Sequence, residues 1–324
     1  MAADSKFSTE NDGFLWSGKV TTDPIFVLAP PCSSAAAFAA MLGRHPQLYD
    51  LPELHLFLAE TMADWSLLAE NASFHMDHGL LRVIAQVFYG AQTEATIRQA
   101  KGWLRRRRHF STGLILETLA LDVYPLILIY TSSSIVRSVE FLDRAYRMFS
   151  DAKFIFVSEH PTRYCRAVLD EWTTAKTSGE VPDWLRKLAF NPHNQQIDPQ
   201  WTWLALCKRI WDFIEPLPDT HKLHIRFDDL VANPEALLHR VAAWIGLRTT
   251  PETVASMQHP EGSVYACYGP CNAVYGNSPA LLRSPGFSTH VSELQPLTAP
   301  LAWLSDSEGF SAEVVKLAEI LGYS

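Results

Sequence analysis

The chain has 324 residues, of which 48% are hydrophobic and 19% charged, and its formal net charge is −8. This length allows one large α/β domain with a well-buried core, and the composition is globular rather than disordered. The acidic balance argues against a general binder of nucleic acid or of an anionic membrane, because long-range repulsion would oppose the encounter.

The cysteines point to a reducing compartment, because their number is odd and no disulfide framework is evident. We therefore expect a cytoplasmic protein. Cys267 and Cys271 stand four residues apart, but no second Cys or His pair with finger-like spacing accompanies them, so no metal site is predicted. No apolar run approaches the ~20 residues that a membrane-spanning helix needs.

Two regions are predicted along the chain: a polar N-terminal arm, residues 1–23, and a single domain, residues 24–324. The domain opens with the apolar run 25–29, which ends at Pro30-Pro31 and is typical of a buried strand. Ser33 and Ser34 can cap the alanine-rich stretch 35–42, a strong helix former that Gly43 closes. A strand, a tight turn and a helix N-terminus in this order can meet an anion.

The stretch from about residue 61 to 110 has mainly helical spacing and predicts a helical insertion. It ends in the basic run Arg105–Arg108. This run indicates either a solvated helix end or a patch that steers anions toward a site.

The rest of the domain alternates strands and helices. Strands are predicted at 126–130, 154–158 and 224–227, with helices at 136–149 and from Pro234 to Gly246. This rhythm predicts an α/β fold with a central, mainly parallel sheet flanked by helices.

Four stretches in this order resemble the sulfotransferase family, most closely its bacterial branch, which includes sulfotransferase domains of polyketide assembly lines. The resemblance implies a P-loop-like α/β fold, with Pro52–Leu56 corresponding to a strand of the family. The four stretches are 26–58, with Gly43–Gln47 and Pro52-Glu53-Leu54-His55-Leu56; 126–130 with the serine turn after it; 154–172, with Glu159-His160-Pro161; and 227–235, with Phe227-Asp228-Asp229-Leu230.

The resemblance also implies a sulfate donor, 3′-phosphoadenosine-5′-phosphosulfate (PAPS), whose product is adenosine 3′,5′-bisphosphate (PAP). In the family a loop after the first strand holds the 5′-phosphosulfate, and an arginine and a serine after a later strand hold the 3′-phosphate. The candidate cofactor-binding residues that remain here are Ser33, Ser34, Arg163, Arg166 and Arg283.

This chain departs from the family at the anion-binding positions. Pro31 stands where a basic residue is expected and offers no backbone N–H, and Ala35 replaces a hydroxyl residue. Glu159 replaces the arginine expected at the 3′-phosphate, and Ala167 replaces its partner serine. A carboxylate ~4 Å from a phosphate would oppose binding by about 1–4 kcal/mol. Arg137 joins Arg163, Arg166, Arg283 and the basic run among residues that could compensate.

Glu53 and His55 are the candidate catalytic residues. Glu53 stands where relatives place a group that faces the acceptor hydroxyl, and on a strand His55 would point to the same side. The alternative is that Glu53 caps a helix and His55 is a hydrogen-bonded core histidine. Cys32 precedes a helix, whose dipole would lower the pKa of its thiol.

Three functions remain open from the sequence. The first is an enzyme that acts on a small molecule or a carrier-tethered natural-product intermediate by acid–base chemistry at Glu53 and His55, with altered or lost use of PAPS. The second is a sulfotransferase that moves sulfate from PAPS to an alcohol or phenol through a rebuilt donor pocket. The third is a non-catalytic binding or scaffold protein. No oligomeric state is predicted.

Overall fold

The computed structural model describes residues 23–72, 74–179, 181–191, 193–287, 295–304 and 309–324, so the predicted polar arm lies outside it apart from its last residue. The strands are β1 (Ile25–Leu28), β2 (Leu48–Asp50), β3 (Ile127–Thr131), β4 (Lys153–Ser158) and β5 (Lys222–Arg226). The α-helices are α1 (Ala35–Gly43), α2 (Met62–Asn71), α3 (His78–Tyr89), α4 (Glu94–Arg105), α5 (Thr112–Val123), α6 (Val139–Met148), α7 (Pro161–Thr177), α8 (Asp183–Ala189), α9 (Gln200–Ile214), α10 (Phe227–Ala232), α11 (Pro234–Ile245), α12 (Pro251–Ser256), α13 (Pro279–Arg283) and α14 (Ala312–Ile320). Short 3-10 helices are η1 (Leu56–Leu58), η2 (Ile135–Arg137) and η3 (Pro260–Gly262).

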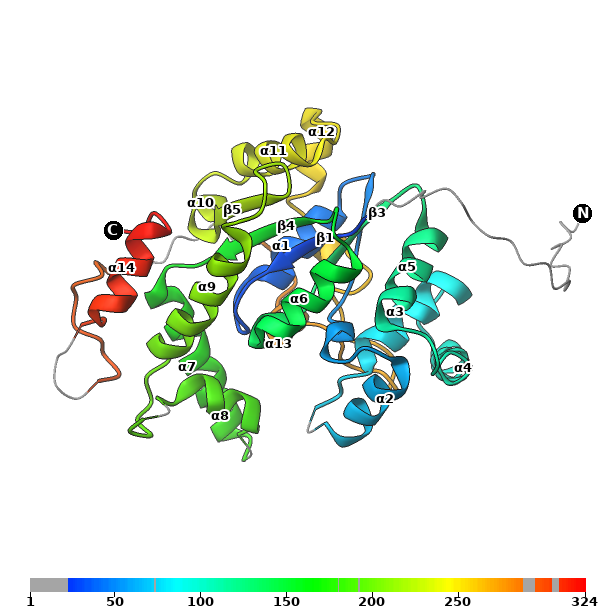
Figure 1. Ribbon diagram of the computed structural model, residues 1–324, viewed down its shortest axis with the longest axis horizontal. Coiled ribbons are helices and arrows are strands. Elements are labelled where there is room, and N and C mark those ends of the chain that lie inside the picture. The colour runs from blue at the N-terminus through cyan, green and yellow to red at the C-terminus, as the bar shows by residue number, and fades with distance from the viewer. Residues whose placement is uncertain (1–22, 73, 180, 192, 288–294, 305–308) are drawn as a thin grey trace, which may run out of the picture.

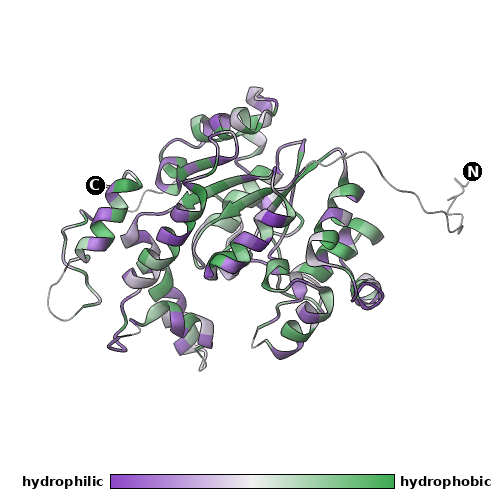
Figure 2. Cartoon of the chain, in the orientation of Figure 1, coloured by the Kyte–Doolittle hydropathy of each residue, from purple (hydrophilic) through white to green (hydrophobic). Residues whose placement is uncertain are grey.

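The five strands form one sheet in the order β2-β3-β1-β4-β5, and all four pairings are parallel. The predicted parallel α/β fold is therefore confirmed. Helices flank the sheet in Figure 1, with α11 and α12 on one side and α6 and α9 on the other. The inner strands β1, β3 and β4 are largely apolar in Figure 2, as expected when both faces of a parallel sheet are covered.

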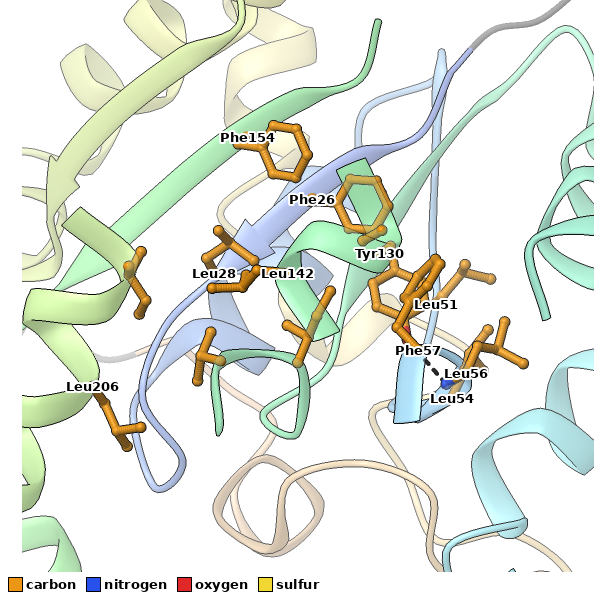
Figure 3. Close-up of a cluster of buried hydrophobic side chains, with 14 of the residues drawn as sticks. Phe26, Leu28, Leu51, Leu54, Leu56, Phe57, Tyr130, Leu142, Phe154 and Leu206 are labelled. Carbon is orange, nitrogen blue, oxygen red and sulfur yellow. Dashed lines mark hydrogen bonds between the residues drawn. The ribbon is translucent and has the colours of Figure 1, made fainter. Parts of the chain in front are cut away.

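Alternate residues of β1 serve the two faces of the sheet. Ile25 and Val27 pack with α1 and α11 in one core cluster, whereas Phe26 and Leu28 belong to a larger cluster with α3, α5, α6 and α9. Figure 3 shows Phe26 between Phe154 and Tyr130 in this second cluster. Its ring centroid lies 5.1 Å from that of Phe154 and 5.2 Å from that of Tyr130.

Several predicted boundaries move by one to three residues. The predicted helix 136–149 divides into η2 and α6, because the Ser138 side chain accepts a hydrogen bond from Glu140 N and starts a new helix there. Phe227, expected to end a strand, instead begins α10. The predicted helical insertion is present as α2, α3 and α4, and α5 extends it to Val123.

The resemblance implied a strand at Pro52–Leu56, and this prediction is wrong. The strand in this region is β2, which ends at Asp50, and Leu51 N makes a last backbone bond to Ile129 O. Pro52 then has no N–H to continue the ladder, and His55 has a left-handed backbone with φ 52°. The chain therefore leaves the sheet before Glu53.

No helix in the described part of the chain is long and apolar enough to cross a bilayer. The described residues also contain no group of three or more His, Cys, Asp or Glu side chains arranged to hold a metal ion.

Asp50 at the end of β2 gives the fold a predicted pH dependence. Its buried carboxyl accepts a 2.5 Å hydrogen bond from Ser263 Oγ, and burial raises its pKa to about 6 against the opposing effects of that bond and of Arg44. The unfolded pKa is about 3.9, so stability from this group is present at low pH and is lost as pH rises from about 4 to about 6, by about 3 kcal/mol.

Asp50→Asn keeps an oxygen acceptor for Ser263 and removes the titration. We expect the unfolding free energy of the variant, from urea melts, to fall less between those pH values than that of the unmodified protein. The exposed change Asp212→Asn on α9 is the control. Equal pH dependence in Asp50→Asn and the unmodified protein would refute the assignment.

Candidate active site

A cavity of about 720 Å³ lies at the carboxyl edge of the sheet, where the loops after β1, β2 and β3 meet. Its wall is completed by α7 and by the segment 275–283 that includes α13. Ligand sites of open parallel sheets occur at this edge. Four of the predicted site residues line this cavity: Glu53, His55, Ser33 and Arg283.

Glu53 is held at the cavity by the C-terminal part of the chain. Its backbone N donates to Gly276 O at 2.9 Å. A Cβ on Gly79 would lie 2.1 Å from Glu53 O, and Gly276, with φ 111°, packs on the Gly79 backbone. Two glycines thus allow three backbone segments to meet behind the Glu53 side chain.

Both the backbone carbonyl and the ring of His55 are held by neighbouring side chains. Its carbonyl accepts a 3.1 Å hydrogen bond from Trp65 Nε1, and its ring packs edge-on against Phe74 with centroids 5.4 Å apart. Its left-handed backbone turns the ring toward Glu53 although the segment is not a strand. A non-glycine residue held in this conformation costs energy and is common at functional sites.

Glu53 and His55 form a close pair. His55 Nε2 lies 3.4 Å from Glu53 Oε2, and the exposed fractions of the two side chains are 7% and 20%. Burial lowers the pKa of His55 against the opposing effect of the Glu53 carboxylate, so the ring is neutral at pH 7. Because a carboxylate has no proton to offer, Nε2 carries the hydrogen and Nδ1 is free to accept one.

The serine turn after β3 surrounds this pair. Ser134 Oγ and Ser132 Oγ lie 3.0 and 3.2 Å from His55 Nδ1. Ser133 donates to Glu53 from its backbone N at 3.3 Å and from its hydroxyl at 3.2 Å. The sequence showed these serines as a turn but gave them no role; their place directly after a buried strand was the available signal.

The candidate arginines differ in whether they line the cavity and in whether another side chain neutralises them. Arg163 Nε pairs with Asp228 Oδ1 at 2.9 Å, and Arg166 is exposed and absent from the cavity wall. Arg283 lines the cavity but pairs with Glu171 Oε2 at 2.7 Å. Arg137, from η2, lines the cavity, and its guanidinium makes no hydrogen bond or ion pair with described residues, although it interacts electrostatically with Glu53. Among these four arginines, Arg137 is thus the one that lines the cavity without a side-chain partner in the described residues.

The amides of the loop after β1 are used within the protein. Ser33 N bonds to Pro30 O at 3.3 Å, and Ser34 N donates to Glu159 Oε1 at 2.6 Å. The Glu159 carboxyl is buried at the N-terminus of α1, the position where the sequence placed an external anion. Burial raises its pKa against the opposing hydrogen bonds from Ser34. Pro31 adds no amide.

Cys32 differs from the sequence expectation. Its residue has φ 64° and it lines the cavity. Burial, reinforced by Glu171 and Glu53, raises the pKa of its thiol to about 12, so the desolvation outweighs the helix dipole. The thiol is therefore protonated at neutral pH and is a poor nucleophile.

A profile described as the sulfotransferase family matches residues 24–251. The chain belongs to the sulfotransferase family. Among solved structures, a sulfotransferase domain from the curacin biosynthetic pathway has 18% identity and a TM-score of 0.67, covering 93% of this chain and 98% of that one. A sulfotransferase domain from the olefin synthase of Synechococcus PCC 7002 has 20% identity and a TM-score of 0.64, covering 95% and 98%.

These two likenesses concern the fold, which agrees with the parallel sheet described above. No curated protein sequence matches the chain.

The residues at the expected donor positions of this family member do not fit PAPS. Glu159 occupies the N-terminus of α1, Arg163 is engaged by Asp228, and Pro31 and Ala35 supply neither charge nor hydroxyl. A polyanion placed there would meet a buried carboxyl group in place of an arginine.

Proposed function

We propose that the protein is an enzyme that acts by acid–base chemistry on a small molecule or a carrier-tethered natural-product intermediate, without PAPS as donor. The observation that carries this proposal is the 2.6 Å bond between Ser34 N and Glu159 Oε1, which gives the helix N-terminus an internal partner. Glu53 and His55 meanwhile remain paired at the cavity and can exchange a proton with a bound substrate.

The charges around the cavity favour a neutral substrate over a nucleotide. Glu53, Asp170 and Glu171 line it, against Arg137 and Arg283. Since Glu171 and Arg283 neutralise each other, the carboxylates of Glu53 and Asp170 face the Arg137 guanidinium, which has no ion-pair partner among the described residues. A donor with several phosphate charges would find little net attraction there.

The wall also offers apolar and aromatic surface. His75 and Tyr275 stack at 5.1 Å between centroids, and Phe74 and Trp184 line the same cavity. Such a wall suits an apolar chain or ring with few polar groups. The two similar structures come from the curacin biosynthetic pathway and an olefin synthase, which supports a biosynthetic intermediate of this kind as substrate.

A titration with PAP tests this proposal. We expect no rise in melting temperature and no saturable heat up to millimolar nucleotide, because the donor positions are filled or changed. A ligand at ~100 times its dissociation constant would stabilise the fold by about 2.7 kcal/mol, which thermal shift detects easily. A PAPS-dependent sulfotransferase in the same buffer is the positive control. Saturable binding of PAP would refute the loss of the donor.

Arg137 is the observation that favours the second function, a sulfotransferase with a rebuilt donor pocket. Its guanidinium lies in the cavity without an ion-pair partner among described residues and could neutralise a transferring group. If PAP binds, Arg137→Ala should weaken it at least about tenfold, the loss expected for a charge-assisted hydrogen bond. Calorimetry on the pair of proteins measures this difference.

A further inference from the structure

Ser132, His55 and Glu53 lie in a continuous chain of contacts. Ser132 Oγ is 3.2 Å from His55 Nδ1, and His55 Nε2 is 3.4 Å from Glu53 Oε2. A hydroxyl, an imidazole and a carboxylate in this order are the elements of an activated serine nucleophile. No sequence motif predicted this group of three side chains, because His55 and Ser132 lie on two loops and are 77 residues apart.

Ser132 is distinguished from its neighbours by position. Ser134 Oγ also reaches His55 Nδ1, at 3.0 Å, but Ser134 does not line the cavity, whereas Ser132 does. Ser133 faces the cavity but contacts Glu53 rather than the imidazole. Only Ser132 among the three combines a contact with Nδ1 and a place on the cavity wall.

Backbone strain gathers at the same place. Among the described residues three non-glycine residues have positive φ, and two of them, Cys32 and His55, line this cavity. Strain of this kind is retained where the surrounding structure must hold a particular geometry.

We propose that Ser132 is a nucleophile for acyl transfer and that the pocket hydrolyses carboxylic esters or thioesters with an apolar acyl chain. The inference rests on the proposed function, because it uses the same cavity and the same acid–base pair. It assigns their roles: His55 Nδ1 is the base, and Glu53 orients the ring and stabilises its cation. The apolar wall of Phe74 and Trp184 would accept the acyl chain.

The reaction balances without a further reagent. Ser132 Oγ attacks the acyl carbon while its proton passes to His55 Nδ1. The bond from that carbon to the alcohol or thiol breaks, and the leaving group takes the proton from His55. Water, deprotonated by His55, then attacks the acyl-serine and releases the acid, and the proton returns to Ser132. Arg137 supplies positive charge in the cavity for the oxyanion formed in each step.

Covalent labelling of the 324-residue chain tests the proposal. A fluorophosphonate probe carrying an alkyl chain should form one adduct, located on Ser132 by mass spectrometry of the peptides. Hydrolysis of p-nitrophenyl butyrate should fall by at least ~10³-fold in Ser132→Ala and in His55→Asn, with unchanged melting temperatures. In Ser134→Ala the adduct should remain on Ser132, with a rate lowered by no more than about tenfold. Ser66→Ala, at a serine on α2 that does not line the cavity, is the control for preparation.

The outcomes separate this inference from the proposed function. Absence of both labelling and hydrolysis in the unmodified protein, or an adduct on another residue, overturns the role of Ser132. That role is also overturned if Ser132→Ala is labelled or hydrolyses the ester at the normal rate. Loss of PAPS use is judged separately by the PAP titration, which does not depend on Ser132. Thioesters of pantetheine in place of the aryl ester then distinguish a carrier-tethered substrate from a free ester.

Discussion

Replacement of Glu53 by Gln should reduce turnover in the cavity by ~10³- to 10⁴-fold, because an amide can present N–H to His55 and so favour the wrong tautomer. Gln retains an oxygen for the hydrogen bond from Ser133 N, so the fold should survive. The rate of p-nitrophenyl butyrate hydrolysis and the melting temperature measure the two effects.

A second readout separates a chemical role from a structural one. The imidazole ¹⁵N shifts of His55 should report a proton on Nε2 in the unmodified protein and a change toward Nδ1 in Glu53→Gln. The matched control is Glu313→Gln, an exposed carboxylate on α14. Normal turnover in Glu53→Gln, with an unchanged His55 spectrum, would remove Glu53 from the acid–base pair.

Phe26→Ala should destabilise the fold by about 3–5 kcal/mol, the range for truncation of a buried aromatic residue. Phe26 is fully buried in the central strand. Its ring centroid lies 5.6 Å from that of Phe57 and 6.1 Å from that of Phe149, and the rings of Phe154 and Tyr130 also pack on it (Figure 3). Alanine at this position would therefore leave a cavity that rigid strands cannot close. Urea-unfolding free energies measure the loss.

Two controls for Phe26→Ala separate the effect of side-chain volume from the effect of burial. Phe26→Leu keeps part of the volume and should cost clearly less than Phe26→Ala. Leu121→Ala on α5, where the side chain is 62% exposed, should change stability by no more than about 0.5 kcal/mol. A loss below about 1 kcal/mol in Phe26→Ala would contradict the central place of this ring in the core.

The local structure and the order of the strands and helices could be predicted from the sequence. Three short-range signals predicted β1, α11 and the parallel sheet. They are the apolar run that ends at Pro30, the helical stretch that begins at Pro234 and ends at Gly246, and the alternation of strands with helices. The family resemblance misplaced the strand near Pro52, and the short-range signals divided neither η2 from α6 nor β5 from α10, because caps and missing amides decide such boundaries within one or two residues.

The sequence also showed which anion-binding residues are absent, since Pro31, Ala35 and Glu159 can be read directly against the family pattern. It predicted repulsion at Glu159. Only the tertiary structure showed that this carboxyl, 125 residues away in the sequence, accepts a hydrogen bond from Ser34 N at the N-terminus of α1.

The cavity itself was decided by tertiary structure. Glu53 and His55 were predicted to share a strand face, but they meet because Gly276 holds one backbone and a left-handed turn directs the other. Periodicity relates residues two to four positions apart, whereas Ser132 reaches His55 only because β3 lies beside β2 in the sheet. The sequence thus determined the elements and the altered residues, and the strand order determined which side chains share one cavity.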